Sequence, residues 1–148
     1  MGSFRDGKGI EYVATAIIVE DNKMLLVHHK KLNLWLPPGG HIEEGELPSE
    51  CVVREVKEET GLDVETINKA PTTVSDHAMQ FPSADWTQLE DIQGTHCHYD
   101  FIYRCKVNGG KLQKSHESND LRFFGIEEVM QLPDTTREVK SLASILLR

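Results

Sequence analysis

Residues 40–62 read GHIEEGELPSECVVREVKEETGL, a stretch that combines helix signals with many carboxylates. Pro48 suits the first turn of a helix, because the N–H that proline lacks would have no partner there in any case. Apolar residues recur behind it at helical spacing. Gly61 falls where a left-handed C-terminal cap is expected. The sequence therefore predicts a helix over about residues 47–60.

Three glutamates of this helix are placed to act together. Glu55, Glu58 and Glu59 are spaced i, i+3 and i+4, so they are neighbours on one helix face. Three like charges repel there, whereas a divalent cation would turn the repulsion into attraction, and carboxylate oxygens suit Mg²⁺ or Mn²⁺. For the three glutamates taken alone, a solvated acidic face is the simpler interpretation, since many surface helices carry one.

The whole stretch resembles the Nudix box, Gly-x5-Glu-x7-Arg-Glu-U-x-Glu-Glu-x-Gly-U with U aliphatic, and it does so without a gap. The matching residues are Gly40, Glu46, Arg54, Glu55, Val56, Glu58, Glu59, Gly61 and Leu62. The resemblance implies a Nudix hydrolase, an α/β protein whose fold is an α/β/α sandwich with a mixed β-sheet between helices. The length of 148 residues fits one such domain over residues 1–148.

The resemblance also implies roles for single residues. Arg54 and Glu46 match a pair that supports the box structurally, and we expect them to form an ion pair. One of the box glutamates, or another glutamate elsewhere, would accept the proton of the attacking water. The implied ligands of Mg²⁺ or Mn²⁺ are the carbonyl of Gly40 and the carboxylates of Glu55, Glu58 and Glu59.

The implied reaction is hydrolysis of a pyrophosphate linkage, in a nucleoside triphosphate or in a nucleoside diphosphate linked to another group. Water attacks phosphorus, and metal ions offset the negative charge that the substrate brings to an acidic protein. A Nudix-like domain that binds a nucleotide or a partner without turnover is the alternative. The intact glutamates favour catalysis. The resemblance does not imply one substrate, because in this family the residues that select the substrate usually lie outside the box.

Outside the box, two further groups are candidates for chemistry. Glu117 precedes a predicted strand, where a further carboxylate joins the metal site or acts as the base in several family members; a solvated loop glutamate is equally compatible with the sequence. His96 and His98 are spaced i, i+2 and share one strand face. They are close enough to hold a metal, but ordinary surface or core histidines are the expected reading of such a pair.

Four residues are candidates for substrate binding. Phe81 and Trp86 lie in a weakly patterned segment over residues 68–94 and could stack on a nucleobase. Each could equally be a hydrophobic anchor of that loop. His28 and Trp35 on the early hairpin are the other two candidates, although a charge run is the simpler account of His28 and core packing is expected for Trp35.

The rest of the chain predicts strands interleaved with two helices. Residues 11–20 and 24–29 are apolar and β-branched and flank an Asp-Asn turn, which predicts a hairpin. A conformationally special loop is expected at the Pro-Pro-Gly-Gly that follows residues 34–36. Further strands are expected at 62–67, 96–107 and 121–126, a turn at 108–110, and a last helix at about 135–147.

Composition narrows the partners. The chain has 16 Lys and Arg against 24 Asp and Glu, a net charge of −8, which disfavours long nucleic acids, capped RNA included, and leaves a small nucleotide-type substrate. Three cysteines without a CxxC pair suggest neither a disulfide framework nor a zinc ribbon. No stretch approaches the about 20 apolar residues of a membrane-spanning helix, and the N-terminus lacks the apolar run of a signal peptide, so we expect a cytoplasmic protein. The oligomeric state is not encoded in any pattern we can interpret.

Overall fold

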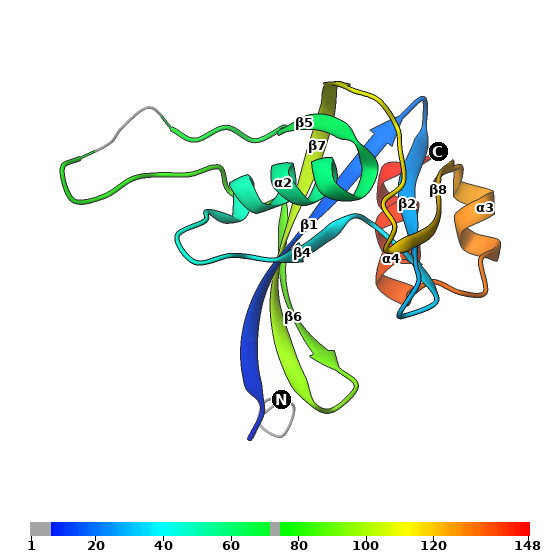
Figure 1. Cartoon of the computed structure of the whole chain (residues 1–148), viewed down its shortest axis with the longest axis horizontal. Coiled ribbons are helices and arrows are strands. Elements are labelled where there is room, and N and C mark those ends of the chain that lie inside the picture. The colour runs from blue at the N-terminus through cyan, green and yellow to red at the C-terminus, as the bar shows by residue number, and fades with distance from the viewer. Residues whose placement is uncertain (1–6, 72–74) are drawn as a thin grey trace.

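The computed structural model describes residues 7–71 and 75–148 and contains one mixed sheet with helices on both faces (Figure 1). Residues 1–6, in the N-terminus expected to lack a signal peptide, and residues 72–74, in the weakly patterned segment, lie outside this description. The strands are β1 (Gly9–Glu20), β2 (Lys23–His29), β3 (Leu34–Leu36), β4 (Gly39–His41), β5 (Leu62–Thr66), β6 (Trp86–Ile92), β7 (His96–Gly110) and β8 (Ser118–Phe124). The helices are α2 (Pro48–Thr60), α3 (Ile126–Gln131) and α4 (Arg137–Leu146).

The sheet is built around two long strands, β1 and β7, which run parallel to each other. Strand order is β3-β2-β1-β7-β5, while β4 also pairs with β1, β6 with β7 and β8 with β2, all of them antiparallel. The predicted hairpin is confirmed, because β1 and β2 are joined by Asp21 and Asn22, whose φ angles are 50° and 59°. Two successive left-handed residues match the twist of such a hairpin.

Alternating side chains of the strands separate two cores. On β1, Ala16 and Ile18 face the core that holds the apolar stripe of α2, whereas Ile17 between them faces the core of α3 and α4. The same alternation recurs on β2, where Leu25 packs toward α2 and Leu26 toward the other helices. Side chains of a strand alternate with a period of two, so one sheet serves both layers. This confirms the predicted α/β/α sandwich.

The helix that carries the box forms where the sequence predicts it. It runs over Pro48–Thr60, and Gly61 ends it with a φ of 76° while donating its N–H to the carbonyl of Lys57. A Cβ at Gly61 would also collide with the carbonyl oxygen of Lys111. Both the positive φ and this close approach therefore require glycine. The local signals at both ends therefore fix the helix that presents the three glutamates.

Several predicted boundaries are wrong because pairing between distant strands overrides local pattern. Gly39 and Gly40 were expected in a loop but belong to β4, which pairs with β1. The expected loop is therefore limited to the two prolines before them. The turn expected at 108–110 is strand, since Gly109 and Gly110 pair with β5. The short helix α3 begins where residues 121–126 were expected to be strand throughout.

The weakly patterned segment also contains a strand that the sequence did not predict. β6 pairs antiparallel with β7 over its whole length, from Trp86 opposite Ile102 to Ile92 opposite His96. Its side chains are mostly half-buried and mixed in polarity, so no clean alternation marks it. Trp86 therefore belongs to the sheet and packs against the core of α3 and α4.

The tertiary position of Trp86 predicts a stability defect rather than a binding defect. Trp86→Ala should lower the free energy of unfolding by about 2 kcal/mol, because a half-buried aromatic side chain leaves a partial cavity. Phe81→Ala is the matched control, since Phe81 is 39% exposed and should cost less than about 1 kcal/mol. Urea unfolding of both variants measures the difference, and equal losses would contradict the packing argument.

Two expectations drawn from composition can be compared with the structure. All three cysteines, Cys51, Cys97 and Cys105, are buried, and no disulfide joins any two of them. Over residues 7–71 and 75–148, no helix has the length and apolar character that crossing a bilayer requires.

Candidate functional site

The site starts where β4 meets α2. A Cβ added to Gly40 would lie 2.5 Å from Oε1 of Glu55, so only glycine lets the helix carboxylate rest against the strand backbone. The Sγ atom of Cys51 lies 3.6 Å from the carbonyl oxygens of both Gly40 and His41, which places this backbone directly over the helix. The structure therefore brings together the strand glycine and the first box glutamate.

Arg54 ties the loop before the helix to the helix itself. Its guanidinium donates to both carboxylate oxygens of Glu46, from Nε at 2.7 Å and from Nη2 at 2.9 Å. Nη1 lies 2.9 Å from Oε1 of Glu55 and 3.3 Å from Oε2 of Glu58. The hydrogen bonds from Arg54 hold the pKa of Glu46 below its usual value. The ion pair predicted between Arg54 and Glu46 is thus present, and it also orients the box carboxylates.

Glu55 and Glu59 form a carboxylate pair that is largely shielded from water. Each of the two carboxyl groups affects the pKa of the other. Burial, followed by the charge of Glu55, raises the pKa of Glu59 to about 8, and nearby Glu117 adds to the rise. Burial also raises the pKa of Glu55 in spite of Arg54. The raised pKa of Glu59 favours a proton on this carboxyl group, and a divalent cation can take the place of that proton.

The donors assembled here fit the metal that the box implies. They are the carboxylates of Glu55 and Glu59 and the neighbouring carbonyl of Gly40, all hard oxygen ligands of the kind Mg²⁺ and Mn²⁺ prefer. Glu58 is more exposed, with 59% of its side chain accessible, and Arg54 holds it beside the pair. All four predicted ligands therefore belong to one neighbourhood.

A cavity of about 550 Å³ opens beside this pair. Gly40 and Glu59 contribute from the box, and apolar side chains of β3 and α4 form part of the wall. The polar residues that line it from β1, β6 and β7 are Thr15, Gln88, Glu90, Asp91, His98 and Asp100. Of these residues, only His98 was a candidate from the sequence; the signal that could have indicated Asp100 is a lone carboxylate inside a strongly strand-like segment.

Asp100 is a buried acid on the wall of this cavity. It is 7% exposed, and its Oδ1 accepts a hydrogen bond of 2.9 Å from the hydroxyl of Thr15. Burial raises the pKa of Asp100 to about 6, with a smaller contribution from the charge of Glu90 and against the hydrogen bond from Thr15, which lowers the pKa. Asp100 therefore holds its proton to a higher pH in the native protein than in the unfolded chain.

Asp100→Asn should stabilise the protein at pH 8. The pKa of Asp100 is raised, so the stability that its neutral form provides is complete below about pH 4 and is lost as the pH rises through about 6. Asparagine keeps an acceptor for Thr15 without a charge, and we expect a gain of about 1–3 kcal/mol at pH 8 that disappears near pH 4. Thermal melts across this range test it, with the exposed Asp76→Asn as control. A gain that does not depend on pH would contradict it.

The residues predicted to bind substrate lie elsewhere in the fold. Trp35 is 7% exposed and packs edge-on against Phe124 in the core. His28 is placed between Asn119, 2.9 Å away, and Asp134, 3.4 Å away, so it links β2 to two other segments. Phe81 is exposed and Trp86 is in β6. The residues that line the cavity include none of Trp35, His28, Phe81 and Trp86.

Glu117 is exposed on the segment that leads into β8. Its carbonyl accepts a hydrogen bond from the N–H of Lys30, and its charge acts on Glu59. It is therefore near the carboxylate pair, but it is not among the residues that line the cavity.

This combination of a box helix, a strand glycine and a sandwich fold has a counterpart among known proteins. The NUDIX domain family model matches residues 11–145. The chain belongs to the NUDIX domain family. A crystal structure of a Nudix-family hydrolase from Clostridium perfringens is similar, with a TM-score of 0.77 and 28% identity over 92% of this chain and 95% of that one.

Two curated relatives show which activities occur among similar Nudix chains. The ADP-ribose pyrophosphatase of Methanocaldococcus jannaschii is 34% identical over 119 residues, which cover 78% of this chain and 62% of the relative. The NAD-capped RNA hydrolase NudC of Vibrio atlanticus is 49% identical over 117 residues, 77% of this chain and 36% of the relative. This Nudix chain thus spans less than two thirds of the length of either relative.

Proposed function

We propose that this Nudix domain hydrolyses the pyrophosphate linkage of a nucleoside diphosphate joined to another group, with Mg²⁺ or Mn²⁺ held by Gly40, Glu55, Glu58 and Glu59. The observation that carries the proposal is the Glu55–Glu59 pair: both carboxylates are largely shielded from water, Glu55 rests against Gly40, and Glu59 lines a cavity. Two carboxylates in contact are costly to keep unless a cation or a proton compensates them.

The residues around the proposed metal site have different roles, which follow from their positions. Arg54 holds Glu55 and Glu58 in place through its hydrogen bonds, with Glu46 fixing the guanidinium from the other side. Among the box carboxylates, Glu59 is the one that lines the cavity, so its carboxylate is our candidate for the acceptor of the water proton. Bound divalent metal would offset the negative charge of the pyrophosphate and polarise the phosphoryl oxygen.

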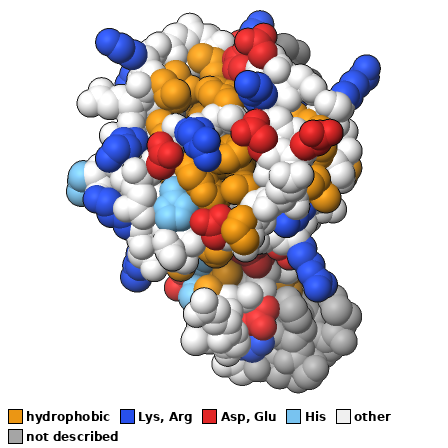
Figure 2. Space-filling view, turned by 90° about the vertical axis from the view of Figure 1, so that its right-hand side faces the viewer, with side chains coloured by type: hydrophobic (Ala, Val, Ile, Leu, Met, Phe, Trp, Pro, Cys, Tyr) orange, Lys and Arg blue, Asp and Glu red, His pale blue; other side chains and the backbone are white. Residues whose placement is uncertain are grey.

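The size and charge of the protein favour a small substrate. A cavity of about 550 Å³ is in the usual range for a small-molecule site. Acidic and basic side chains are interspersed on the face drawn in Figure 2, and the net charge is −8, so a continuous basic groove for RNA is not supported there. The names of the two relatives point to ADP-ribose and to NAD as the groups to test first.

A substrate panel tests the proposal. The purified chain is incubated with ADP-ribose, NAD⁺, a UDP-sugar and a nucleoside triphosphate, each with Mg²⁺, Mn²⁺ or EDTA, and the products are resolved by chromatography. We expect one of the first three to be split between its two phosphorus atoms, with no reaction in EDTA. Binding of a nucleotide without turnover of any compound would favour the non-catalytic alternative, and full activity in EDTA would contradict the metal.

A further inference from the structure

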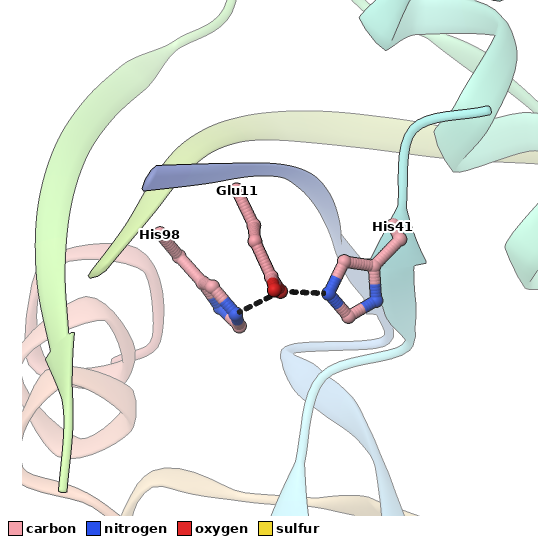
Figure 3. A group of neighbouring side chains, drawn as sticks. All are labelled: Glu11, His41 and His98. Carbon is pink, nitrogen blue, oxygen red and sulfur yellow. Dashed lines mark hydrogen bonds and ion pairs between the residues drawn. The ribbon is translucent and has the colours of Figure 1, made fainter. Parts of the chain in front are cut away.

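Three side chains from three neighbouring strands meet beside the box glycine, outside the carboxylate pair. Oε1 of Glu11 on β1 lies 2.7 Å from Nε2 of His41 on β4 and 3.5 Å from Nε2 of His98 on β7 (Figure 3). One ligand atom from each residue lies within 4.8 Å of the other two. All three side chains point toward one point between the strands.

The register of the sheet creates this meeting. Glu11 is directly opposite His98 in the parallel pair of β1 and β7, and His41 is opposite Val13 on the other side of β1. A fourth group, His96, reaches the same place, with its Nε2 3.1 Å from Nε2 of His98 and 3.5 Å from Oε1 of Glu11. A hydrogen bond between these two Nε2 atoms requires one of them to be the acceptor. The acceptor nitrogen carries no proton, and its lone pair is of the kind that binds a metal.

We propose that Glu11, His41 and His98 form a site for a borderline transition metal, with Zn²⁺ as the representative ion. Imidazole nitrogen and carboxylate oxygen are established zinc ligands, whereas Mg²⁺ seldom takes imidazole. Ligand atoms around tetrahedral zinc are about 3.3 Å apart, given bonds of about 2.0–2.1 Å. The distances of 2.7 Å and 3.5 Å from Glu11 lie on either side of this value.

The position of this histidine site gives it two consequences. It joins β4 to β1 and β7 immediately after Gly40, so a bound ion clamps the strand that carries a box ligand. His41 and His98 also line the cavity together with Glu59. His96 or a water can complete the coordination, and a water position facing the cavity is open to a polar substrate group. The inference concerns a site separate from the proposed Mg²⁺ site and does not depend on the proposed activity.

Metal titration in excess Mg²⁺ tests the histidine site, because Mg²⁺ occupies the box and leaves imidazole free. The full chain is first freed of transition metals and placed in excess Mg²⁺. Co²⁺ is then added and its visible absorption is recorded, and the Zn²⁺ affinity is measured by calorimetry. We expect one equivalent of Co²⁺ with the strong absorption of a four- or five-coordinate ion, displaced by Zn²⁺. Zn²⁺ should also raise the melting temperature, since it binds the folded state.

Variants locate the ion. His98→Ala should weaken Zn²⁺ binding by about 100-fold or more, and His41→Ala and Glu11→Gln by at least about tenfold. His116→Ala is the control, since His116 is exposed in the turn before β8, a strand that pairs with β2 and not with the three strands of the cluster, and the Zn²⁺ affinity of this variant should not change. Glu59→Gln in the box should also keep the Zn²⁺ affinity, which separates this result from a failure of the proposed function.

Several results would overturn the proposed histidine site. Absence of Zn²⁺ binding overturns it, and so does binding that both His41→Ala and Glu11→Gln leave unchanged. Circular dichroism checks that each variant is folded; if His98→Ala is not, Glu11→Gln decides, because Glu11 is about half exposed and Gln keeps its shape. A rise in melting temperature with inorganic phosphate but not with Zn²⁺ would assign the cluster to anion binding instead.

Discussion

Glu59→Gln is expected to lower kcat by about 10²–10⁴ while the protein stays folded. The substitution keeps the shape of the side chain but removes a charge that both the metal and the water proton require, and such a loss is worth several kcal/mol in the transition state. Among the box glutamates, substitution of Glu59 is expected to lower kcat the most. Glu59 is the box glutamate that lines the cavity, and burial and the charge of Glu55 raise its pKa to about 8.

The same variant separates chemistry from folding. In EDTA at alkaline pH it should melt at the same temperature as the wild type or higher, because one of two carboxylates in contact has lost its charge. Glu44→Gln is the matched control, an exposed glutamate in the loop before the helix, and should change neither kcat nor melting temperature. A Glu59→Gln protein that keeps full activity would remove Glu59 from the site, and an unfolded one would make it structural.

Gly40→Ala is expected to lower kcat by about 100-fold or more. The added Cβ would lie 2.5 Å from Oε1 and 2.6 Å from Cδ of Glu55, so the carboxylate must move away from the strand. A shift of about 1 Å in a catalytic group can cost about 10² in rate. Because Arg54 holds Glu55 at 2.9 Å, the shift should also disturb Glu58 and weaken the apparent Mg²⁺ affinity.

Gly9→Ala provides the matched comparison on the same sheet. Among residues 7–71 and 75–148, nothing lies within 4 Å of a Cβ at Gly9, so this variant should keep the wild-type kcat and Mg²⁺ dependence. Measuring kcat against Mg²⁺ concentration for both variants distinguishes a misplaced ligand from a general loss of fold, which melting temperatures also report. A Gly40→Ala protein with kcat within threefold of Gly9→Ala would show that Glu55 relaxes without consequence.

The sequence alone predicted the box, because its geometry is local. Glu55, Glu58 and Glu59 are neighbours on any helix by virtue of their spacing, and Pro48 and Gly61 mark where that helix begins and ends. The ion pair of Arg54 with Glu46, which the resemblance to the Nudix box implied, spans only 8 residues. The hairpin of β1 and β2 was predictable for the same reason, since a short turn brings adjacent strands together.

Only the tertiary structure decided what surrounds the box. Thr15 meets Asp100 across 85 residues, and Glu11 meets His41 and His98 through the register of three strands. Trp86, predicted in a loop, is in a strand because β7 supplies its hydrogen-bonding partners. A helix fixes which side chains are neighbours by its own period, whereas a sheet does so by pairing between distant segments, and a one-residue change of register would reverse every face. The cavity wall and the histidine cluster therefore follow from pairing that no local pattern in the chain specifies.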